Sequence, residues 1–300
     1  MSESGIMQQV MHIEKSNKAE ASHFALCNGG HIRYLIALDG ESKKRLSKNI
    51  STYSGKLGLL MKLMRFIPFS ALKTAGMGHF VRVKLALSVQ TTIDKLTADA
   101  WNMIVGTYDE KQKVVLQCYR HGEALSDFVK VGNSATDKEM KAEIDFLKEP
   151  HLYRCFDVPE LLESSYTDKQ TPFNIQVTKE FVGKKVEPVI NADIIRIYQE
   201  ISANKKIIDG VEYEFSHGDF APWNIKSNAE GYVVFDWEHC GYRIKGFDLM
   251  HYGVVSRVML EGMELSEAFD ESMELIHQFL SEYKLDKELF IREYQKLRLE

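Results

Sequence analysis

The chain has few cysteines, and their spacing excludes the chemistry that cysteines most often bring. Cys27, Cys118, Cys155 and Cys240 lie far apart in the 300 residues and form no CxxC pair. Structural zinc sites and disulfide frameworks both need closely patterned cysteines. We therefore expect neither of them here.

Long apolar runs are also missing. The N-terminal residues lack the basic region, apolar run and cleavage site of a secretory signal. Lys62, Arg65 and Lys73 interrupt the longest apolar stretches, which are then too short for a membrane-spanning helix. We therefore expect a cytoplasmic protein.

The sequence has no excess of positive charge and lacks several common catalytic motifs. The formal net charge is -5, whereas dedicated nucleic-acid binders are usually strongly basic. No G-x-S-x-G and no G-x-x-x-x-G-K-[ST] occurs, so an α/β-hydrolase or a P-loop enzyme is unsupported. Nucleic acid is therefore not an expected partner.

Acidic residues are absent between Glu41 and Asp94, and residues 42–93 form a basic window. Within it, residues 57–72 place apolar side chains at roughly helical spacing, and Pro68 should end or kink that helix. One interpretation is a helical pair with a solvated basic face. The other is a surface that meets anionic lipid or an anionic acceptor, which would hold the protein at the inner face of the membrane.

From Trp101 onward the pattern changes to that of strands. Residues 101–106 and 114–119 are rich in β-branched and aromatic side chains, and a polar connection of hairpin type joins them. A turn at residues 121–123 leads to a third short strand at 127–131. Three successive antiparallel strands are thus predicted.

A helix and two further strands follow. Thr136 or Asp137 caps a helix predicted over 136–147, and the strands are expected at 158–162 and 173–181. The order β-β-β-α-β-β followed by helices indicates an α+β fold in which a β-rich lobe is joined to a helical one.

The residues with the clearest chemistry lie between Ser216 and Glu238. Asp219 and Asn224 are five residues apart in a polar loop, and an apolar strand then ends in Asp236. Side-chain oxygens of this kind suit Mg²⁺, which takes one or two carboxylates together with phosphate oxygens and water. The remaining carboxylate would lie near an acceptor hydroxyl, and phosphoryl transfer requires that combination.

Three ordered motifs carry a resemblance to a known superfamily. The segment His-Gly-Asp-Phe-Ala-Pro-Trp-Asn (217–224) matches an H-x-D-x-x-x-x-N loop, Phe-Asp-Trp-Glu (235–238) matches a metal-binding motif, and Gly-Phe-Asp-Leu (246–249) resembles the G-x-D-L that follows. Together they resemble the aminoglycoside phosphotransferase and choline kinase superfamily, which is protein-kinase-like.

That resemblance implies a two-lobed fold with a small β-rich N-lobe containing one key helix and a larger, mostly helical C-lobe. We place a basic, partly helical extension at 1–97, the N-lobe at 98–182 and the C-lobe at 183–300. The boundary between the lobes is expected near 181–184, where a glycine follows the last strand.

The resemblance also implies roles for residues of the C-lobe. Asp219 would orient the acceptor hydroxyl or also deprotonate it, while Asn224 and Asp236 would bind the metal. His217 would hold the loop through backbone hydrogen bonds, and Asp248 would brace the loop from behind.

Three further residues are expected near the acceptor. Glu238 follows the metal-binding motif and would lie beside the acceptor or behind the metal ligands. Trp223 and Trp237 could contribute a cation–π wall for an amine acceptor.

In the N-lobe the resemblance requires a lysine paired with a glutamate. Lys130 lies on the third predicted strand, and Glu143 lies on the following helix on the side of Phe146. Glu139 is the alternative partner, one turn earlier. Without the downstream motifs, Lys130 and Glu143 would be interpreted as surface charges.

The remaining nucleotide contacts are less distinctive. Gly106 and Thr107 occupy the place of the phosphate-covering loop, although no G-x-G-x-x-G occurs. The hinge whose backbone would meet the purine of ATP or GTP comprises Thr178, Lys179, Glu180 and Phe181.

The sequence thus predicts a Mg²⁺-dependent small-molecule kinase that transfers the γ-phosphate of ATP or GTP to a hydroxyl. The motif variant is similar to phosphotransferases with bacterial surface-polysaccharide functions, which implies a sugar or sugar-containing acceptor. An aminoglycoside or choline-type amine kinase is the alternative, with acidic residues at Glu261, Glu264, Glu267, Asp270, Glu271 and Glu274. A pseudokinase or interaction module would have lost one of Lys130, Asp219, Asn224 and Asp236, and none is missing.

Overall fold

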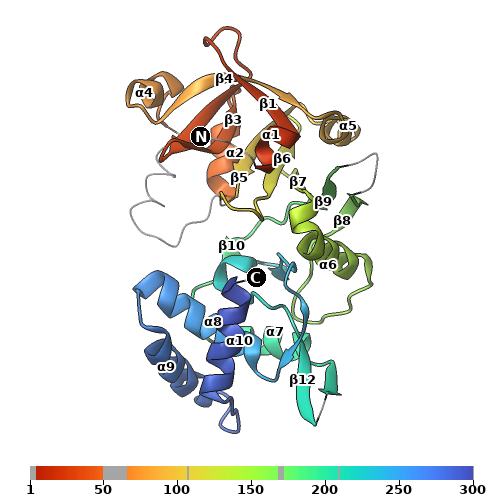
Figure 1. The fold of residues 1–300 in the computed structure, drawn as a ribbon, viewed down its shortest axis with the longest axis vertical. Helices are drawn as coiled ribbons and strands as arrows, with labels where there is room; N and C mark the ends of the chain where they lie inside the picture. Colours follow the sequence, from red (N-terminus) through yellow and green to blue (C-terminus); the bar gives the residue numbers. More distant parts are fainter. Residues whose placement is uncertain (1–4, 50–65, 107, 168–171, 209, 300) are drawn as a thin grey trace. The chain divides into compact units, whose positions relative to one another are not determined.

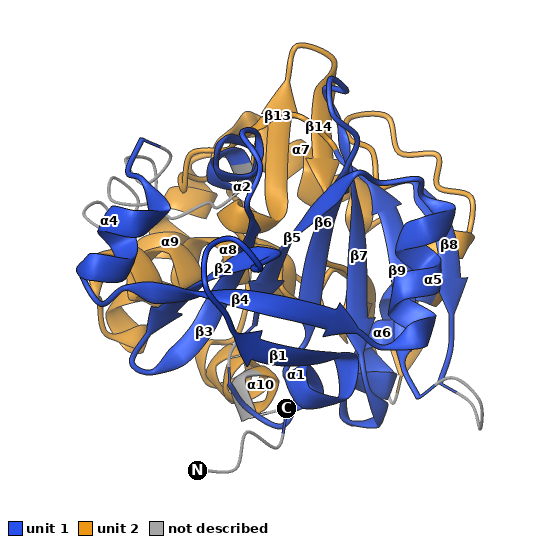
Figure 2. Cartoon of the chain, turned by 90° about the horizontal axis from the view of Figure 1, so that it is seen from above, with its two compact units in different colours: residues 1–144, 160–180 blue, residues 145–159, 181–300 orange. Residues whose placement is uncertain are grey.

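The computed structural model divides the chain into two compact units (Figure 2). The first comprises Met1–Ile144 and Glu160–Glu180, and the second comprises Asp145–Pro159 and Phe181–Glu300. The structure describes residues 5–49, 66–106, 108–167, 172–208 and 210–299. Antiparallel sheets with separate helices make this an α+β protein, as predicted.

The first unit contains a nine-stranded antiparallel sheet in the order β1-β4-β2-β3-β5-β6-β7-β9-β8. Figure 1 colours these strands from red to green. Their bounds are β1 Met11–Lys15, β2 His23–Asn28, β3 His31–Ala37, β4 Gly78–Leu85, β5 Ala100–Val105, β6 Val114–Tyr119, β7 Ser126–Gly132, β8 Leu161–Ser165 and β9 Asn174–Lys179.

The first four strands lie in residues 1–97, where the sequence predicted a basic, partly helical extension. A two-residue turn, Gly29–Gly30, joins β2 to β3, and both glycines have positive φ (60° and 83°). Such a turn after Asn28 is a strong hairpin signal. Strand β3 then pairs with β5, with Tyr34 opposite Ile104. By these contacts residues 1–97 belong to the same compact unit as the strands that follow them.

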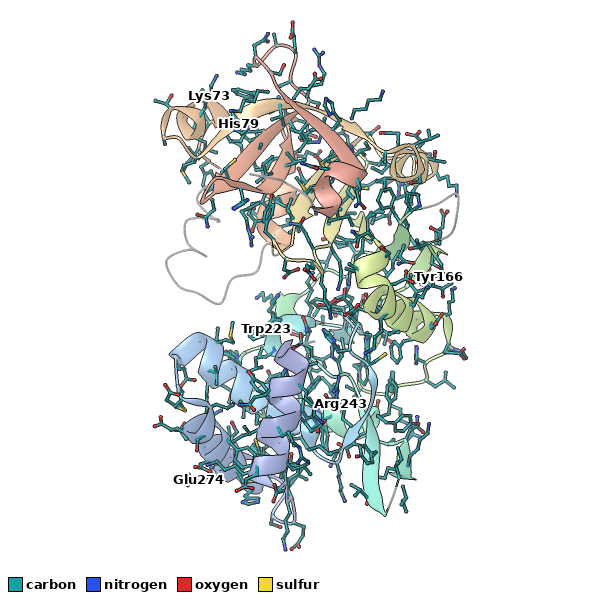
Figure 3. All side chains as sticks on the ribbon, viewed as in Figure 1. Lys73, His79, Tyr166, Trp223, Arg243 and Glu274 are labelled. Carbon is teal, nitrogen blue, oxygen red and sulfur yellow. The ribbon has the colours of Figure 1, made fainter. Side chains whose placement is uncertain are left out.

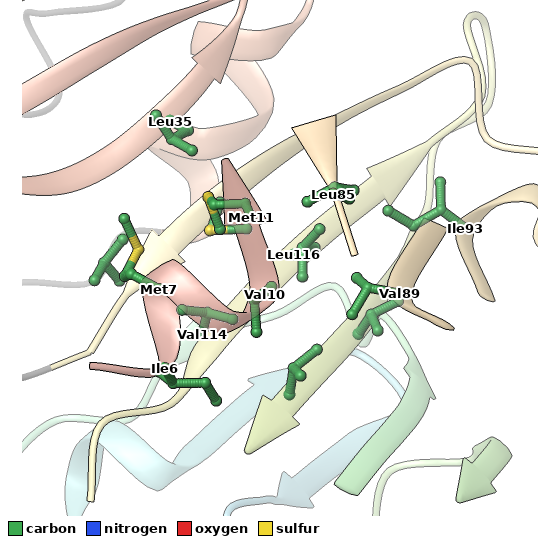
Figure 4. Packing of buried hydrophobic residues seen from close by; sticks show 14 of the residues in the cluster. Ile6, Met7, Val10, Met11, Leu35, Leu85, Val89, Ile93, Val114 and Leu116 are labelled. Carbon is green, nitrogen blue, oxygen red and sulfur yellow. The ribbon is translucent and has the colours of Figure 1, made fainter. Parts of the chain in front are cut away.

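Two apolar clusters cover the two faces of these strands, because successive side chains point to opposite faces. Ala25 and Val81 belong to the cluster under α1 (Ile6–Val10) and α5 (Leu87–Lys95), where Val10, Val89 and Ile93 pack on Leu116 and Val114 (Figure 4). The neighbouring residues Phe24 and Phe80 belong to the other cluster. That cluster includes Leu46 of α2 (Ser42–Asn49) and Leu72 of α4 (Phe69–Thr74).

The basic window is only partly described. Most of the helix predicted over 57–72 falls in residues 50–65, which lie outside the described residues. Pro68, expected to end or kink that helix, directly precedes α4, and residues 66–68 before α4 are not helical. Two of the described cations have contacts inside the unit: the Lys43 Nζ lies 3.9 Å from the centre of the Phe69 ring, and Arg45 donates to Glu41.

The remaining elements of this unit follow the predicted order. Strands β5, β6 and β7 lead into α6 (Asp137–Lys148), and β8 and β9 come next. Strand β8 begins at Leu161 rather than at 158. Pro159 has no N–H to donate to a sheet, which accounts for the later start.

The second unit combines two small sheets with helices. Strand β13 (Ile225–Asn228) pairs with β10 (Lys184–Lys185) and β14 (Gly231–Val234), and β12 (Val211–Ser216) pairs with β11 (Lys205–Ile208) and β15 (Gly241–Ile244). The helices are α7 Ala192–Ile201, η2 Pro222–Asn224, α8 Phe247–Ser256, the π-turn η3 Arg257–Glu261, α9 Leu265–His277 and α10 Lys287–Leu299. Every residue of α8 is buried, so this helix forms the centre of the unit.

Within the described residues, none of the helices combines the length and the apolar composition that crossing a membrane requires.

Candidate active site

The predicted catalytic loop follows β12 in the second unit and turns at Gly218. This glycine has φ +84°, and a Cβ there would lie 2.1 Å from the backbone oxygen of His239. Both the positive φ and the close backbone approach require glycine. The turn allows the chain to reverse into Asp219 and then enter η2.

Asp248, on the first turn of α8, accepts three hydrogen bonds from the start of the loop. Its Oδ1 accepts from the Ser216 Oγ at 2.6 Å and from the Gly218 N–H at 3.0 Å, and its Oδ2 accepts from the His217 N–H at 2.6 Å. The carboxylate is buried. It therefore has the bracing contacts that the sequence predicted.

His217 is fully buried, and within the described residues its ring nitrogens bond to backbone atoms. The Asp219 N–H donates to its Nδ1 at 3.2 Å, so the other ring nitrogen, Nε2, carries the proton and donates to the Phe235 carbonyl at 3.1 Å. Burial lowers the pKa of this imidazole. A neutral histidine thus ties the loop to the end of β14, in agreement with a supporting role.

Asp219 is held by two side-chain donors. Its Oδ1 lies 3.0 Å from the His251 Nε2, and its Oδ2 accepts from the Asn224 Nδ2 at 3.0 Å. Burial favours the neutral acid, but the hydrogen bond from His251 and its electrostatic attraction outweigh burial, so the pKa of Asp219 is lowered. The side chain remains 31% exposed. Asp219 is therefore an ionised carboxylate that solvent or a substrate can reach.

Asn224 is oriented by the same carboxylate. Its Nδ2 donates to the Asp219 backbone oxygen at 2.9 Å and to the Asp219 Oδ2. Both bonds use the amide nitrogen. The side-chain atom that then has the chemistry of a metal ligand is the amide oxygen.

Asp236 follows β14 in a left-handed backbone conformation, with φ 73°. Aspartate is among the few residues that adopt this conformation readily. A carboxylate oxygen of Asp236 and one of Glu238 lie within 4.8 Å of each other. These hard oxygen donors, with the amide oxygen of Asn224, fit the ligand preference of Mg²⁺.

The sequence analysis did not single out two lysines of this unit, one of which, Lys185, interacts with the charge of Asp236. Lys185 of β10 is directly opposite Lys226 of β13 in the strand register. Burial and then the charge of Lys226 lower the pKa of Lys185 to about 8, against the opposing effect of Asp236. Like charges opposite each other on two strands repel, which is why the charge of Lys226 helps to lower the pKa of Lys185.

Trp237 is not an acceptor contact, which corrects the prediction. Its side chain is fully buried, stacks on Phe146 with ring centres 4.0 Å apart, and donates from Nε1 to the Val234 carbonyl. The apolar surface of Trp237 is therefore buried in the core of the unit. Trp223, labelled in Figure 3, is half-buried at η2 beside Asn224.

The predicted lysine–glutamate pair is formed in the first unit. The Lys130 Nζ of β7 lies 2.7 Å from the Glu143 Oε2 of α6, and the two side chains are 17% and 3% exposed. The rival, Glu139, instead accepts from the Lys111 Nζ at 2.8 Å. The structure therefore selects Glu143 over Glu139 as the partner of Lys130.

The other described residues that were predicted to contact the nucleotide take part in backbone hydrogen bonds or belong to strands. The Gly106 N–H donates to the Lys113 carbonyl at 3.0 Å, while Thr107 lies outside the described residues. Thr178 and Lys179 belong to β9, and the Glu180 carboxylate accepts from the Ser126 N–H at 2.7 Å.

Phe181 begins the second unit, where its carbonyl accepts from the Lys226 Nζ at 3.3 Å. The proposed hinge thus spans a point where the chain passes between the units.

Two of the acidic residues that suggested an amine acceptor form ion pairs with basic side chains. On α9, the Glu271 carboxylate accepts from Arg257 at 3.1 Å and Asp270 from Lys287 at 2.6 Å. Their charge is therefore balanced locally. Glu274, on the same helix, is labelled in Figure 3.

A cavity of about 910 Å³ lies elsewhere in the first unit. Residues of α1, β1 and the β2–β3 turn line it together with residues 108–110 and Gln112. None of the predicted site residues is among them, so the cavity is distinct from the groups described above.

Comparisons with known proteins give only remote likenesses. No protein-family model matches the chain, and no curated protein matches it. An amicoumacin kinase solved with AMP-PNP, Ca²⁺ and Ami aligns at a TM-score of 0.40 and 15% identity over 64% of this chain and 78% of that one.

Two further solved structures align at similar levels. A microcompartment-associated aminopropanol kinase gives a TM-score of 0.41 at 15% identity over 70% of this chain and 86% of that one. A putative fructosamine-3-kinase from Haemophilus somnus 129PT gives 0.38 at 7% identity over 70% and 96%. Likeness at this level does not assign the chain to a family.

Proposed function

We propose that this protein is a Mg²⁺-dependent phosphotransferase that transfers the γ-phosphate of ATP or GTP to a hydroxyl of a small molecule. The observation that carries the proposal is the arrangement around Asp219. An ionised, partly exposed carboxylate is fixed by Asn224 and His251 in a loop that Asp248 braces. A second carboxylate, Asp236, follows the adjacent strand, and that is the set of groups phosphoryl transfer needs.

Different residues of the second unit would bind the cation and orient the acceptor hydroxyl. The bound cation would neutralise charge on the phosphates, and Asn224 and Asp236 are the residues that would hold it. Asp219 would accept a hydrogen bond from the acceptor hydroxyl and direct its oxygen at the phosphorus. Because its pKa is lowered, Asp219 is a weak base, so orienting the hydroxyl is its main contribution.

The acceptor class rests on the sequence motif. The form that the motifs take at residues 217–224 and 235–238 is similar to that in phosphotransferases with surface-polysaccharide functions. This similarity supports a sugar or sugar-containing acceptor. An amine acceptor draws less support, because Glu271 and Asp270 already pair with basic residues. Lys130, paired with Glu143, is the proposed phosphate contact in the first unit.

Nucleotide binding is the first test. We expect ATP or GTP to raise the melting temperature of the wild-type protein in the presence of Mg²⁺, and the increase to be lost in Asp236→Ala. A ligand at one hundred times its Kd stabilises the folded state by about 2.7 kcal/mol. Absence of any shift for a folded wild-type sample, with both nucleotides, would contradict the proposal.

Phosphoryl transfer is the second test, measured as nucleoside diphosphate release with a panel of sugars and aminoglycosides. We expect Asp219→Asn to reduce transfer by about 10²- to 10⁴-fold, because the amide no longer attracts the hydroxyl proton. The variant should keep the Mg²⁺-dependent thermal shift. Equal transfer by the variant and the wild type would show that Asp219 is not the catalytic residue.

A further inference from the structure

His251 lies on α8, three residues after Asp248, and contacts Asp219 across 32 residues of sequence. Its side chain is 1% exposed. The rings of Phe247 and Tyr294 pack against it, with centres 5.7 Å and 5.5 Å from that of the imidazole. The position of the ring is therefore fixed by packing.

The proton on this imidazole can be placed from its partner. An ionised Asp219 only accepts hydrogen bonds, so the His251 Nε2 carries a proton and donates it to Oδ1. The other ring nitrogen, Nδ1, is buried and has no hydrogen-bond partner within the described part of the chain. Buried polar atoms without partners are rare and destabilising. The ring thus has a single polar contact, and that contact is with Asp219.

The two donors of Asp219 act on different oxygens. His251 binds Oδ1 and Asn224 binds Oδ2, so rotation of the carboxylate would break both contacts. A carboxylate has about four lone-pair positions, which leaves some to accept a hydrogen bond from a substrate hydroxyl. Asn224 would also bind the cation, whereas the described hydrogen bonding of His251 serves the carboxylate alone.

We propose that His251 is the positioning residue for Asp219: it fixes the orientation of the catalytic carboxylate toward the acceptor hydroxyl. This inference rests on the proposed phosphotransferase function. His251 touches no reacting atom in this scheme. It acts through Asp219, so its loss should change the turnover step and leave nucleotide binding intact.

The contact itself can be tested without any activity. Nitrogen-15 NMR of the histidine rings should show His251 protonated at Nε2, with its signals shifted in Asp219→Asn. In thermal denaturation, the combined decrease in melting temperature for His251→Leu and Asp219→Asn should exceed that of the double variant, because the two residues interact. An Nδ1–H tautomer, or strictly additive decreases, would overturn the contact.

The positioning role is tested by replacing His251 with two polar residues whose amide nitrogens lie at different distances along the side chain. The amide nitrogen of glutamine lies as far along the side chain as the His251 Nε2, whereas that of asparagine is one bond shorter. We expect His251→Asn and His251→Leu to lower kcat by about 10- to 100-fold, with nucleotide Kd and acceptor KM within about twofold, and His251→Gln to recover most of the loss.

Ser256→Ala is the matched control, since Ser256 is buried on the same helix and its hydroxyl, within the described part of the chain, bonds to the Tyr252 carbonyl alone. It should leave kcat unchanged. Equal kcat for His251→Asn, His251→Gln and the wild type would overturn the inference, as would a parallel loss of kcat and nucleotide binding in all variants. If the wild type transfers phosphate to no acceptor, the proposed function fails, while the NMR and denaturation results still decide the contact.

Discussion

Glu214 is the carboxyl of the second unit with a pKa displaced into the neutral range. It is 2% exposed on β12, and its Oε1 accepts from the Tyr198 hydroxyl at 2.9 Å and from the Gly246 N–H at 2.7 Å. Burial raises the pKa of Glu214 from 4.5 to about 7, against the effect of these two donors. Because Gly246 directly precedes α8, this carboxyl lies at the start of the helix that carries Asp248 and His251.

This shift predicts a specific dependence of stability on pH. Between pH 4.5 and 7 the unfolded chain loses the Glu214 proton while the folded protein keeps it, so the free energy of unfolding falls as pH rises. Above pH 7 the loss is constant, on the order of 3 kcal/mol. We expect Glu214→Gln to remove this contribution and to be the more stable protein at pH 8, measured by urea denaturation at several pH values.

The exposed Glu212, on the same strand, provides the control. Glu212→Gln should not reproduce the change in pH dependence. If Glu214→Gln and the wild type lose stability in parallel between pH 4.5 and 7, the Glu214 carboxyl does not titrate in that range.

At the scale of elements, α8 organises the catalytic loop through Asp248. Three donors of the loop, from Ser216, His217 and Gly218, converge on this one carboxylate. In Asp248→Asn, the amide NH₂ group would face at least one of these donors, and it cannot accept a hydrogen bond. Hydrogen bonds to a buried charge contribute about 1.5–3 kcal/mol each, so we expect a loss of stability of about 3 kcal/mol.

Chemical denaturation measures this loss, with Ser256→Ala as the reference for removing an ordinary hydrogen bond of α8. We expect the reference to lose about 1 kcal/mol. A loss in Asp248→Asn no larger than in the reference would mean that the carboxylate does not hold the loop.

The sequence was informative where structure depends on neighbouring residues. The strands ending near Val105, Tyr119 and Gly132 and the helix after Thr136 could be predicted because their periodicity and capping residues are local. Motif spacing likewise located Asp219, Asn224 and Asp236.

What the sequence did not predict depends on pairing between distant segments. The approach of His251 to Asp219 is set by how α8 packs, and the position of Lys185 opposite Lys226 is set by the pairing of β10 with β13. The first four strands were missed for a different reason. A hairpin signal is present at Asn28–Gly30, but the prediction for this region rested on the basic composition of residues 42–93, which contain just one of the four strands, β4.

At the scale of the whole molecule, residues 1–97 supply part of the core of the first unit. Strand β3 covers the edge of β5, and α1 and α5 cover Leu116, Val129 and Val131. An uncovered strand edge invites aggregation, and each large apolar side chain returned to water costs about 1.5–3 kcal/mol.

We therefore expect residues 98–300, expressed alone, to aggregate or to lose on the order of 5 kcal/mol of stability. Size-exclusion chromatography and thermal denaturation measure this, and co-expression with residues 1–97 should restore a folded complex. A monomeric 98–300 fragment that melts at the temperature of the full chain would show that residues 1–97 are a separate extension.

The left-handed backbone at Asp236 restricts how this protein can change by mutation. Glycine and asparagine adopt that conformation readily, and each can be reached from an aspartate codon by a single base change. Neither supplies a carboxylate. The substitutions that preserve the backbone most easily are thus the ones that remove the proposed metal ligand, so under the proposed function a lineage could lose turnover here in one step while its fold remained intact.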